Sequence, residues 1–332
     1  MGIIKDLQDR IKGHGLRIVF AEGYSQRVLS AAIRHQELGY IHPIVLGQPD
    51  VITVQAKEIG KNIGDLEIID INNYPDIDKM VEDYVKRRNG KEDEETARKM
   101  LRNPNYFGTM LIYQGLADGM ISGAVGSTAE TILPALKLIK TSPDSKLVSG
   151  AMIMVGPENQ EYVFADIAVN IMPTPEELVY ISHDAAKFAK MFGIDPKIAM
   201  LSFSTKGSAS SPEQEKMVEA TKLAHKMFPR LPVDGELQFD AAVVPVIGAR
   251  KAQGSKIAGH ANVFIFPNLD AGNIGYKIGQ HLGHYLALGP ILLGLNAPIN
   301  DLSRGCTEED VFLTAIVTAA MALEHSLQDQ PY

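Results

Sequence analysis

Two rhythms of hydrophobic and polar positions alternate along the chain. Short runs rich in β-branched residues, such as LRIVFA, KIAMLSF and NVFIFP, are followed by longer segments in which apolar positions recur with helical spacing. Repeated units of a strand and then a helix predict parallel sheets that are covered by helices on both faces. The predicted fold class is therefore α/β.

Three segments depart from this alternation. Residues 84–117 have a helical pattern only, which predicts a cap or lid between strands. The polar segment KTSPDSK, at 140–146, contains proline and follows a helix, as is typical of a crossing between domains. The run GPILLGLN and the helix after residue 307 have no sheet of their own to complete and could return to the first domain. We predict a discontinuous first domain of residues 1–143 plus 298–332, completed by the final helix, and a second domain of residues 144–297.

Composition narrows the classes of function. At 332 residues the chain is longer than one core usually supports, and its 45% of hydrophobic residues can fill two. A formal net charge of -8 and a pI near 5.6 argue against a nucleic-acid-binding protein, which needs a basic face. Local positive charge must therefore meet any anionic ligand.

The cysteine content and the apolar runs bear on the compartment. Cys306 is the only cysteine, which excludes an internal disulfide framework and is typical of a reducing compartment. The N-terminal segment has charges throughout and lacks the apolar core of a signal peptide, and we expect no later run to span a bilayer. We predict a soluble, cytoplasmic protein without a membrane or nucleic-acid partner.

The sequence lacks two common nucleotide-binding motifs and an obvious set of metal ligands. No GxGxxG follows the first predicted strand, and no GxxxxGK[ST] occurs in the chain, which disfavours a dehydrogenase or a triphosphate enzyme. His281 and His284 are expected to share a helix face, but no carboxylate or third ligand lies at an obvious spacing. We therefore predict no metal site.

Three turns between a strand and a helix are suited to binding anions. In 122–131, small residues leave backbone N–H groups accessible, and Ser127 and Thr128 lie where a helix would begin. The alternative is that one of these hydroxyl residues only caps the helix, supported by Glu130. In 268–277, two glycines allow a close approach and Asn273 offers an amide, although tight helix packing would explain the glycines equally well.

The remaining turn, 202–215, crowds hydroxyl groups and a lysine at the end of a predicted strand. Such a loop can hold a phosphate with hydroxyls, amides and an ammonium group, or it can be a solvated turn before a helix that starts at Ser-Pro. The candidate residues are Ser204, Thr205, Lys206, Gly207 and Ser208.

The segment NDLSRGCTEED, at 300–310, precedes an apolar helix. Thr307 and Asp310 have the spacing of a capping box, which accounts for the acidic run. Ser303 and Arg304 precede the cap, and the planar guanidinium of an arginine suits a phosphate or a developing oxyanion. Cys306 is interpreted as a small packing residue, because neighbouring carboxylates would raise the pKa of its thiol.

Several motifs together resemble the phosphate acetyltransferase family, also called phosphotransacetylases. They occur in the family's order over nearly the whole chain, from RIVFAEG at 17–23 to the final helix, and several long motifs in register are far more specific than one. The motifs are STAET…PALKLIKT, VFADIAVN, IAMLSFSTKGSA, LQFDAA, ANVFIFPNLDAGNIGYKIGQ and NDLSRGC.

This resemblance implies a fold, a reaction and roles for residues. It implies two α/β/α domains with mainly parallel sheets and an interdomain active-site cleft, in a homodimer. The implied reaction interconverts acetyl phosphate plus coenzyme A with acetyl-coenzyme A plus phosphate by direct thiolate attack in a ternary complex. Coenzyme A would be a co-substrate, and no tightly bound cofactor is implied.

Carried over by position, the catalytic residues would be Ser303, Arg304 and Asp310. Asp310 would take the thiol proton, Ser303 would help to hold the oxyanion, and Arg304 would bind phosphoryl or carbonyl oxygens. The turns at Ser127 and Thr128 and at 204–208 would line the phosphate and acyl site, and Arg87 or Arg88 would meet coenzyme A. A cap would stabilise the charge of Asp310 and weaken it as a base, so we predict that its carboxylate turns away and leaves the cap to Thr307.

The sequence also departs from the family pattern. Leu133 stands where an arginine thought to meet coenzyme A is usual, and Ile167 stands where a cysteine is common. Leu293 and Ala297 replace residues that are usually polar or basic. Two alternatives follow: an enzyme for longer acyl chains such as propionyl or butyryl, and a non-catalytic acyl-coenzyme A binder.

Overall fold

The computed structural model describes residues 2–328 and forms two compact units. The first unit comprises Met1–Ser142 and Leu295–Tyr332, and the second comprises Pro143–Gly294. Each unit has its own sheet, the sheets are mainly parallel, and helices lie on both sides of them. The predicted α/β class is confirmed.

The first unit is built on a five-stranded sheet whose paired strands are all parallel. Its spatial order is β11 (Ile299–Asp301), β4 (Gly119–Ser122), β1 (Arg17–Phe20), β2 (His42–Leu46) and β3 (Glu67–Ile69). The chain adds β2 and β3 on one side of β1, and β4 and β11 on the other. The order therefore reverses between β1 and β4, and ligands of open α/β sheets bind beyond the carboxyl ends of the strands at such a point.

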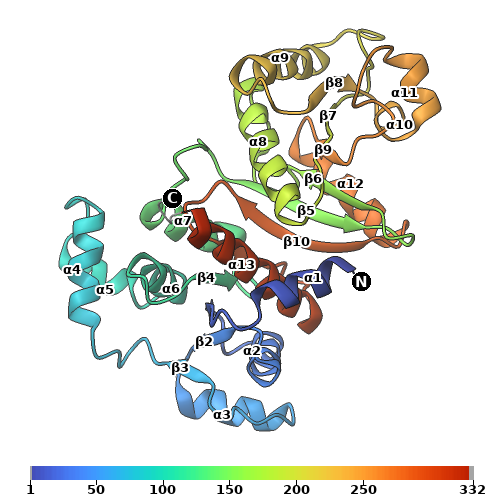
Figure 1. Ribbon diagram of the computed structural model, residues 1–332. Coiled ribbons are helices and arrows are strands. Elements are labelled where there is room, and N and C mark those ends of the chain that lie inside the picture. Colours follow the sequence, from blue (N-terminus) through green and yellow to red (C-terminus); the bar gives the residue numbers. More distant parts are fainter. Residues whose placement is uncertain (1, 329–332) are drawn as a thin grey trace. The chain divides into compact units, whose positions relative to one another are not determined.

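Helices cover both faces of this sheet (Figure 1). On one face, α1 (Gly2–Ile11), α2 (Gln26–Leu38) and α13 (Glu308–Gln328) pack together, and α3 (Pro49–Glu58) lies beside α2. On the other face, the helices are α4 (Ile77–Arg87), α5 (Glu94–Met100), α6 (Pro104–Tyr113) and α7 (Thr128–Leu138).

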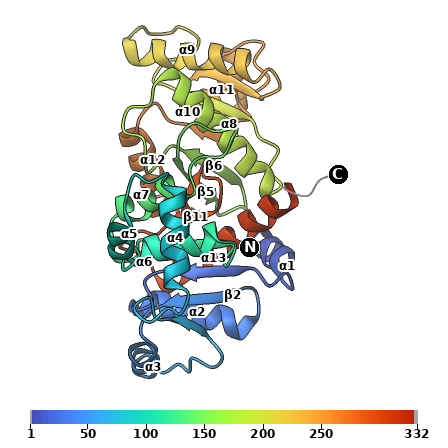
Figure 2. The same cartoon turned by 90° about the vertical axis from the view of Figure 1, so that its left-hand side faces the viewer.

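The segment predicted to be helical only is helical, and it forms α4, α5 and α6, which lie side by side (Figure 1, Figure 2). These helices are part of the core, because Met80, Tyr84 and Phe107 are fully buried in one apolar cluster with residues of β1 and β2. Burial of each such large side chain stabilises the packing of these helices on the sheet by about 1.5 to 3 kcal/mol.

Helix α13 corrects one expectation. Residues Glu308–Leu327 are long and apolar enough to cross a membrane, with a mean hydropathy of 1.3, contrary to the prediction that no run would be. Two thirds of this stretch, 67%, is buried inside the protein, where the helix packs on α1, α2 and β4. Its apolar surface is therefore explained by its place in the core of the first unit.

The second unit has a six-stranded sheet. Its spatial order is β10 (Leu286–Leu293), β5 (Ser149–Val155), β6 (Glu161–Ala165), β9 (Val263–Ile265), β7 (Ile198–Leu201) and β8 (Val233–Leu237). The pairs β10–β5 and β5–β6 are antiparallel and the others are parallel. Its helices are α8 (Pro175–Met191), α9 (Pro212–Met227), α10 (Phe239–Val243), α11 (Pro245–Lys251) and α12 (Leu269–His281).

Strand β10 overturns the expectation that GPILLGLN could return to the first domain. Most of this run lies in β10, which pairs with β5 in the sheet of the second unit. An antiparallel edge strand needs no crossover helix, so the alternation of strands and helices gave no signal for it.

Candidate active site

The groups of interest in the first unit lie at the carboxyl ends of three neighbouring strands. Glu22 follows β1, the turn at 123–127 follows β4, and Asp301 ends β11. Because the strands are parallel, these ends meet at one edge of the sheet, at the point where the strand order reverses. The fold thus brings together polar residues that are far apart in the sequence.

Glu22 occupies the amides of the first predicted anion turn. Its carboxylate accepts hydrogen bonds from the backbone N–H of Ala124 at 2.6 Å, of Val125 at 3.1 Å and of Gly126 at 2.9 Å. The side chain is buried, and a buried carboxylate persists only when such donors replace water. The turn does bind an anion, but that anion is a side chain of the protein itself.

Ser127 acts as the alternative interpretation predicted, at the start of α7. The Oε2 atom of Glu130 accepts hydrogen bonds from the Ser127 N–H at 2.6 Å and from its hydroxyl at 3.0 Å. These bonds, first that of the amide, hold the pKa of Glu130 below its ordinary value. The cap of α7 is thereby confirmed, and a role for Ser127 in substrate binding stays a prediction.

The exposed residue Thr128 forms a hydrogen bond with a buried carboxyl group. Its hydroxyl donates to Oδ2 of Asp301 at 2.6 Å, and Asp301 is only 3% exposed. Burial raises the pKa of Asp301 to about 6, the Thr128 hydrogen bond opposes this rise, and the charge of Glu22 adds to it. Asp301 therefore titrates close to neutral pH.

The loop after β11 presents an unpaired cation. The side chain of Arg304 is exposed and has no hydrogen-bond or ion-pair partner among residues 2–328. Ser303 is also exposed, and its hydroxyl accepts from the Gly305 N–H at 3.2 Å. Both predicted residues thus lie at the surface, available to a ligand.

Arg27, on α2, fixes this loop against the turn after β4. Its guanidinium donates to the carbonyl oxygens of Arg304 at 3.0 Å and Cys306 at 2.5 Å. The same group donates to the carbonyl of Ala124 at 2.9 Å. A planar fork of donors suits this task, since it binds several carbonyls in one geometry.

The predicted capping box at Thr307 and Asp310 is confirmed, and the predicted orientation of Asp310 is wrong. Its Oδ2 atom accepts from the Thr307 N–H at 2.7 Å and from the Thr307 hydroxyl at 2.9 Å. The Asp310 N–H in turn donates to the Thr307 hydroxyl oxygen at 3.2 Å. The N–H groups at a helix start have no acceptor within the helix, and the Asp310 carboxylate supplies one for Thr307.

Cys306 is buried, as expected of a packing residue. Burial raises the pKa of its thiol, Arg27 opposes the rise, and Asp310 adds to it. The thiol is therefore a poor nucleophile at neutral pH.

In the second unit, Glu236 fills the loop at 202–215 much as Glu22 fills the first turn. Its Oε1 atom accepts from the Ser204 hydroxyl at 2.9 Å, the Gly207 N–H at 2.7 Å and the Gln214 amide at 3.0 Å. Burial raises its pKa, but these hydrogen bonds, led by that of Gly207, outweigh burial and hold the pKa below its ordinary value.

The other residues of this loop also bind within the protein. The Thr205 N–H donates to the hydroxyl of Ser208 at 3.0 Å, and the Thr205 hydroxyl accepts from the Gln238 N–H at 2.9 Å. Lys206 donates to Asp234 at 2.5 Å and to the Gly235 carbonyl at 2.8 Å. The loop is thus ordered by its own contacts, and no solvated turn is needed to explain it.

The third turn shows the tight packing that its glycines allow. A Cβ atom on Gly272 would lie 2.1 Å from the carbonyl oxygen of Asp166, so α12 approaches this segment closely. Asn273 is half-buried, and its amide donates to the Ile167 carbonyl at 3.1 Å. The expected shared helix face of His281 and His284 is wrong, because α12 ends at His281.

Arg87 and Arg88 both bind the carboxyl end of α7. Arg87 donates to the carbonyls of Leu138 at 2.5 Å and Ile139 at 3.1 Å. Arg88 forms an ion pair with Glu92 at 2.8 Å and is mostly buried. Cations favour the carboxyl end of a helix, which gives both arginines a structural role in this conformation.

The positions that depart from the family pattern differ in exposure. Leu133 lies on α7 and is 52% exposed, so a cation in its place would reach solvent. Ile167 and Leu293 are buried, and Ala297 packs partly buried against the core.

Comparison with known proteins gives this arrangement a family. The family model described as phosphate acetyl/butaryl transferase matches residues 2–319. The chain belongs to this family. It is 51% identical over 321 residues to a phosphate acetyltransferase from Bacillus subtilis, covering 97% of this chain and 99% of the relative.

Solved structures agree in fold. A phosphotransacetylase from Streptococcus pyogenes has a TM-score of 0.93 and 51% identity, with 97% of this chain and 98% of that chain covered. A phosphotransacetylase from Staphylococcus aureus has a TM-score of 0.90 and 47% identity, with the same coverage of 97% and 98%.

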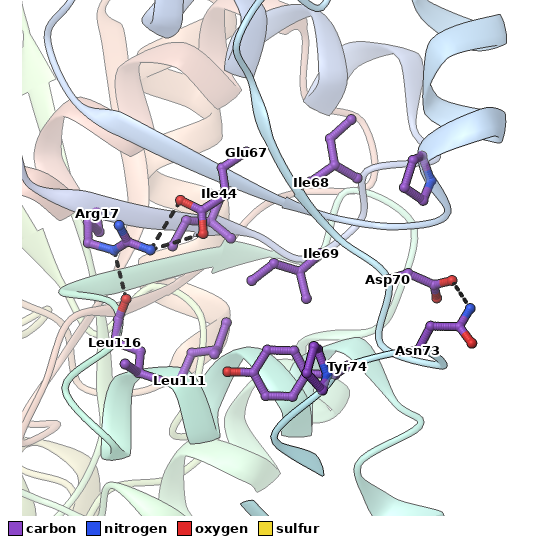
Figure 3. A pocket seen from close by; sticks show the side chains of 12 residues that line it. Arg17, Ile44, Glu67, Ile68, Ile69, Asp70, Asn73, Tyr74, Leu111 and Leu116 are labelled. Carbon is purple, nitrogen blue, oxygen red and sulfur yellow. Dashed lines mark hydrogen bonds and ion pairs between the residues drawn. The ribbon is translucent and has the colours of Figure 1, made fainter.

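In this phosphate acetyl/butaryl transferase family member, a cavity of about 410 Å³ lies away from the residues described above. Arg17 and Glu67 form an ion pair at one end of it and Asp70 binds Asn73 at the other, around Ile69 and Tyr74 (Figure 3). Arg17 and Glu67 already bind each other, Asp70 already accepts from the Asn73 amide, and no predicted site residue lines the cavity.

Three residues of the site were missed by the sequence reasoning. Glu22, Arg27 and Asp301 are single polar residues at the end of a strand or on a helix, and each acts through partners about 100 or more positions away in the chain. A polar residue directly after a buried strand was the available signal for Glu22 and Asp301. Within residues 2–328, no group of three or more His, Cys, Asp or Glu residues is placed to hold a metal ion.

Proposed function

We propose that the chain is a phosphate acetyltransferase, which reversibly transfers an acetyl group between acetyl phosphate and coenzyme A. Its 51% identity over nearly full length to a relative of that name is the observation that carries the proposal. Coenzyme A is a co-substrate in this reaction and not a resident cofactor. We further propose a cytoplasmic homodimer.

The proposed chemistry is direct attack by the coenzyme A thiolate in a ternary complex. The thiol loses its proton, the sulfur bonds to the carbonyl carbon of acetyl phosphate, and the bond from that carbon to the phosphate oxygen breaks. A thiol with an ordinary pKa near 8.5 needs only modest help to ionise. The demanding step is stabilisation of the tetrahedral oxyanion and of the leaving phosphate.

Arg304 and Ser303 are the residues proposed for that step. The exposed, unpartnered guanidinium of Arg304 offers charge-assisted hydrogen bonds to phosphoryl or carbonyl oxygens. Ser303 adds a hydroxyl, and Arg27 supports both by binding the loop's carbonyls at Arg304 and Cys306. Because Arg27 already holds these carbonyls from α2, the loop has less conformational freedom to lose when a substrate binds.

The capped conformation of Asp310 bears directly on its proposed role as the base. Two hydrogen bonds from Thr307 hold the carboxylate at the start of α13 and occupy its Oδ2 atom. We therefore propose that Asp310 takes the thiol proton only after it releases Thr307. Asp310→Asn tests this role, because asparagine can still accept from the Thr307 N–H but cannot act as a base. A fall in kcat with unchanged thermal stability supports the role, and unchanged kcat contradicts it.

Substrate binding is proposed at the turns already described. Thr128 would meet the phosphoryl group, and Ser204, Thr205, Lys206, Gly207, Ser208, Ser127 and Asn273 remain predictions for the phosphate and acyl site. Arg87 or Arg88 would have to exchange its contact with the end of α7 for coenzyme A.

The defining experiment supplies acetyl, propionyl and butyryl phosphate, each with coenzyme A, and follows thioester formation. We expect the highest kcat/KM with acetyl phosphate. Faster turnover of butyryl phosphate would show that the enzyme prefers a longer acyl chain. If none of the three is turned over and acyl-coenzyme A still binds, the protein is a non-catalytic binder.

A further inference from the structure

Thr128 and Asp301 form a pair whose hydrogen bond depends on a single proton. The Thr128 hydroxyl donates to Oδ2 of Asp301 at 2.6 Å, while Oδ1 of Asp301 is buried without a hydrogen-bond partner among residues 2–328. Oδ1 lies against Gly123, where an added Cβ would come within 2.2 Å of it. Packing therefore holds the carboxyl group next to Thr128 and away from water.

The surroundings of Asp301 favour its neutral form. Burial is the main cause that raises the pKa of Asp301, the Thr128 and Thr131 hydroxyls on α7 oppose the rise, and the charge of Glu22, from the turn after β1, adds to it. The Thr131 hydroxyl is itself buried and makes no hydrogen bond of normal geometry. Helix α13 contacts β11 through neutral groups, as in the bond from Asn300 to Thr318.

The proton count decides what Thr128 can offer a ligand. A hydroxyl has one proton, and an ionised Asp301 takes it, which leaves only lone pairs of Thr128 for a ligand. A neutral Asp301 can instead donate its own proton to the Thr128 oxygen. The Thr128 proton is then free to bind an anion.

Several other donors of the turn are already occupied. Glu22 holds the amides of Ala124, Val125 and Gly126, and Glu130 holds the hydroxyl of Ser127. Glu130 is exposed and its pKa is lowered, so it stays ionised near neutral pH. Thr128 is therefore the hydroxyl of this turn that a titration near neutral pH can release.

We propose that Asp301, through its protonation state, determines whether Thr128 can donate a hydrogen bond to the phosphoryl group of the acyl phosphate. This inference rests on the proposed function, which puts that group at Thr128. One proton from solvent resides on Asp301 while the substrate is bound, and no bond in the substrate changes. Asp301 is thus a positioning residue that acts through Thr128.

Asp301→Asn tests the proposal, because the carboxamide can donate to Thr128 at every pH. The KM for acetyl phosphate is measured at saturating coenzyme A from about pH 5.5 to 7.5, across the range in which a carboxyl group of pKa near 6 ionises. We expect the ratio of the wild-type KM to the variant KM to rise at least about tenfold over this range. The same ratio for the KM of coenzyme A should stay constant.

Asp93→Asn is the matched control. Asp93 caps α5 through the Thr96 N–H and lies in the first unit, outside the proposed site. Its KM for acetyl phosphate should follow that of the wild type at every pH. A constant ratio for Asp301→Asn as well would overturn the proposal.

Substitutions of Thr128 decide the question even if Asp301→Asn fails to fold. Thr128→Ser keeps the hydroxyl and should keep the pH dependence of the KM. Thr128→Val should give a KM that is high and has lost this dependence. If Thr128→Val retains the wild-type dependence, the pair is not its origin and the proposal fails. Transfer activity in the wild type would then still support the proposed function, whereas no transfer at all would overturn both.

Discussion

The two turns filled by Glu22 and Glu236 have the same design and different surroundings. In both, a buried glutamate accepts hydrogen bonds from the turn that follows a strand. In the second unit the nearby cation, Lys206, is bound by Asp234, and the hydrogen bonds keep Glu236 ionised. In the first unit the cation on the neighbouring loop, Arg304, has no partner within the described part of the chain, and a second acid, Asp301, has a raised pKa.

This difference separates a turn with fixed charges from one whose charge can change. A carboxylate with several N–H donors is stable at neutral pH and contributes order. Burial pushes the second carboxyl group, Asp301, toward its neutral form and the charge of Glu22 adds to this, as at many functional sites. The first turn therefore has the features expected of a ligand-binding site.

The largest expected effect comes from removing the two cations in turn. Arg304→Ala should reduce kcat about 100-fold or more, the scale of one lost oxyanion donor. Lys206→Ala should cost much less, since Asp234 and the Gly235 carbonyl already bind its ammonium group. Steady-state assays with acetyl phosphate and coenzyme A measure both. Equal losses of kcat in the two variants would contradict the claim that only the first turn lies beside a cation that is available to substrate.

Cys306→Ala provides the local control for Arg304→Ala. The thiol is buried and its pKa is raised, so the change should leave kcat nearly intact. A loss as large as that of Arg304→Ala would mean that Cys306 has a chemical role.

Glu22→Gln and Glu236→Gln should each lower the free energy of unfolding, by about 1 to 3 kcal/mol, because one charged acceptor of buried N–H groups is lost. They should differ in a second respect. Burial is the main cause of the raised pKa of Asp301, and Glu22→Gln removes only the charge that adds to it, so that pKa should fall slightly. Denaturant unfolding measures the first effect and carboxyl NMR the second, and a fall of the Asp301 pKa in Glu236→Gln would contradict the account.

The pH dependence of stability should have opposite signs at the two turns. The folded pKa of Asp301, about 6, exceeds its ordinary value of 3.8. Its contribution is therefore fully present below pH 3.8 and is lost as the pH rises through 6. The pKa of Glu236 is lowered from 4.5, so its contribution is present above that pH and is lost in more acidic solution.

Denaturant unfolding of the wild type and of Asp301→Asn, at several pH values, isolates the first contribution. The buried His35, with a pKa lowered by burial to about 3, destabilises both proteins below pH 6.5 and cancels in the difference. The wild type should lose stability relative to the variant between pH 4 and pH 7. A difference that does not change with pH would show that Asp301 is ionised throughout.

The smallest expected effect concerns the helix that begins at the first turn. Leu133→Arg should lower the KM for coenzyme A about threefold, the scale of an exposed ion pair worth roughly 0.7 kcal/mol. Leu136→Arg adds the same charge at another exposed position of α7 and should change little. If both variants lower the KM for coenzyme A equally, the added positive charge attracts coenzyme A in general and position 133 has no special role.

Local patterns predicted much of this structure. The alternation of strands and helices gave the fold class, capping statistics gave the start of α13 at Thr307, and they left Ser127 and Thr128 as alternative caps for α7. Small-residue turns were correctly placed after strands. What those turns contain could not be predicted, because Glu22 and Asp301 reach them only through parallel strand pairing.

The orientation of Asp310 was predicted wrongly for a related reason. Its role as a base came from resemblance, whereas its position in the structure follows from the free N–H groups of a helix start. The pairing of strand β10 was not predicted, because its antiparallel partner lies more than 100 residues earlier in the chain.

The most direct test is a carbon-13 NMR titration of the side-chain carboxyl groups, with Asp301 assigned by comparison with Asp301→Asn and Glu236 by comparison with Glu236→Gln. The account predicts a midpoint near pH 6 for Asp301 and a midpoint below 4.5 for Glu236. A midpoint for Asp301 near its ordinary value of 3.8 would contradict it, because the two turns would then carry the same fixed charge at neutral pH.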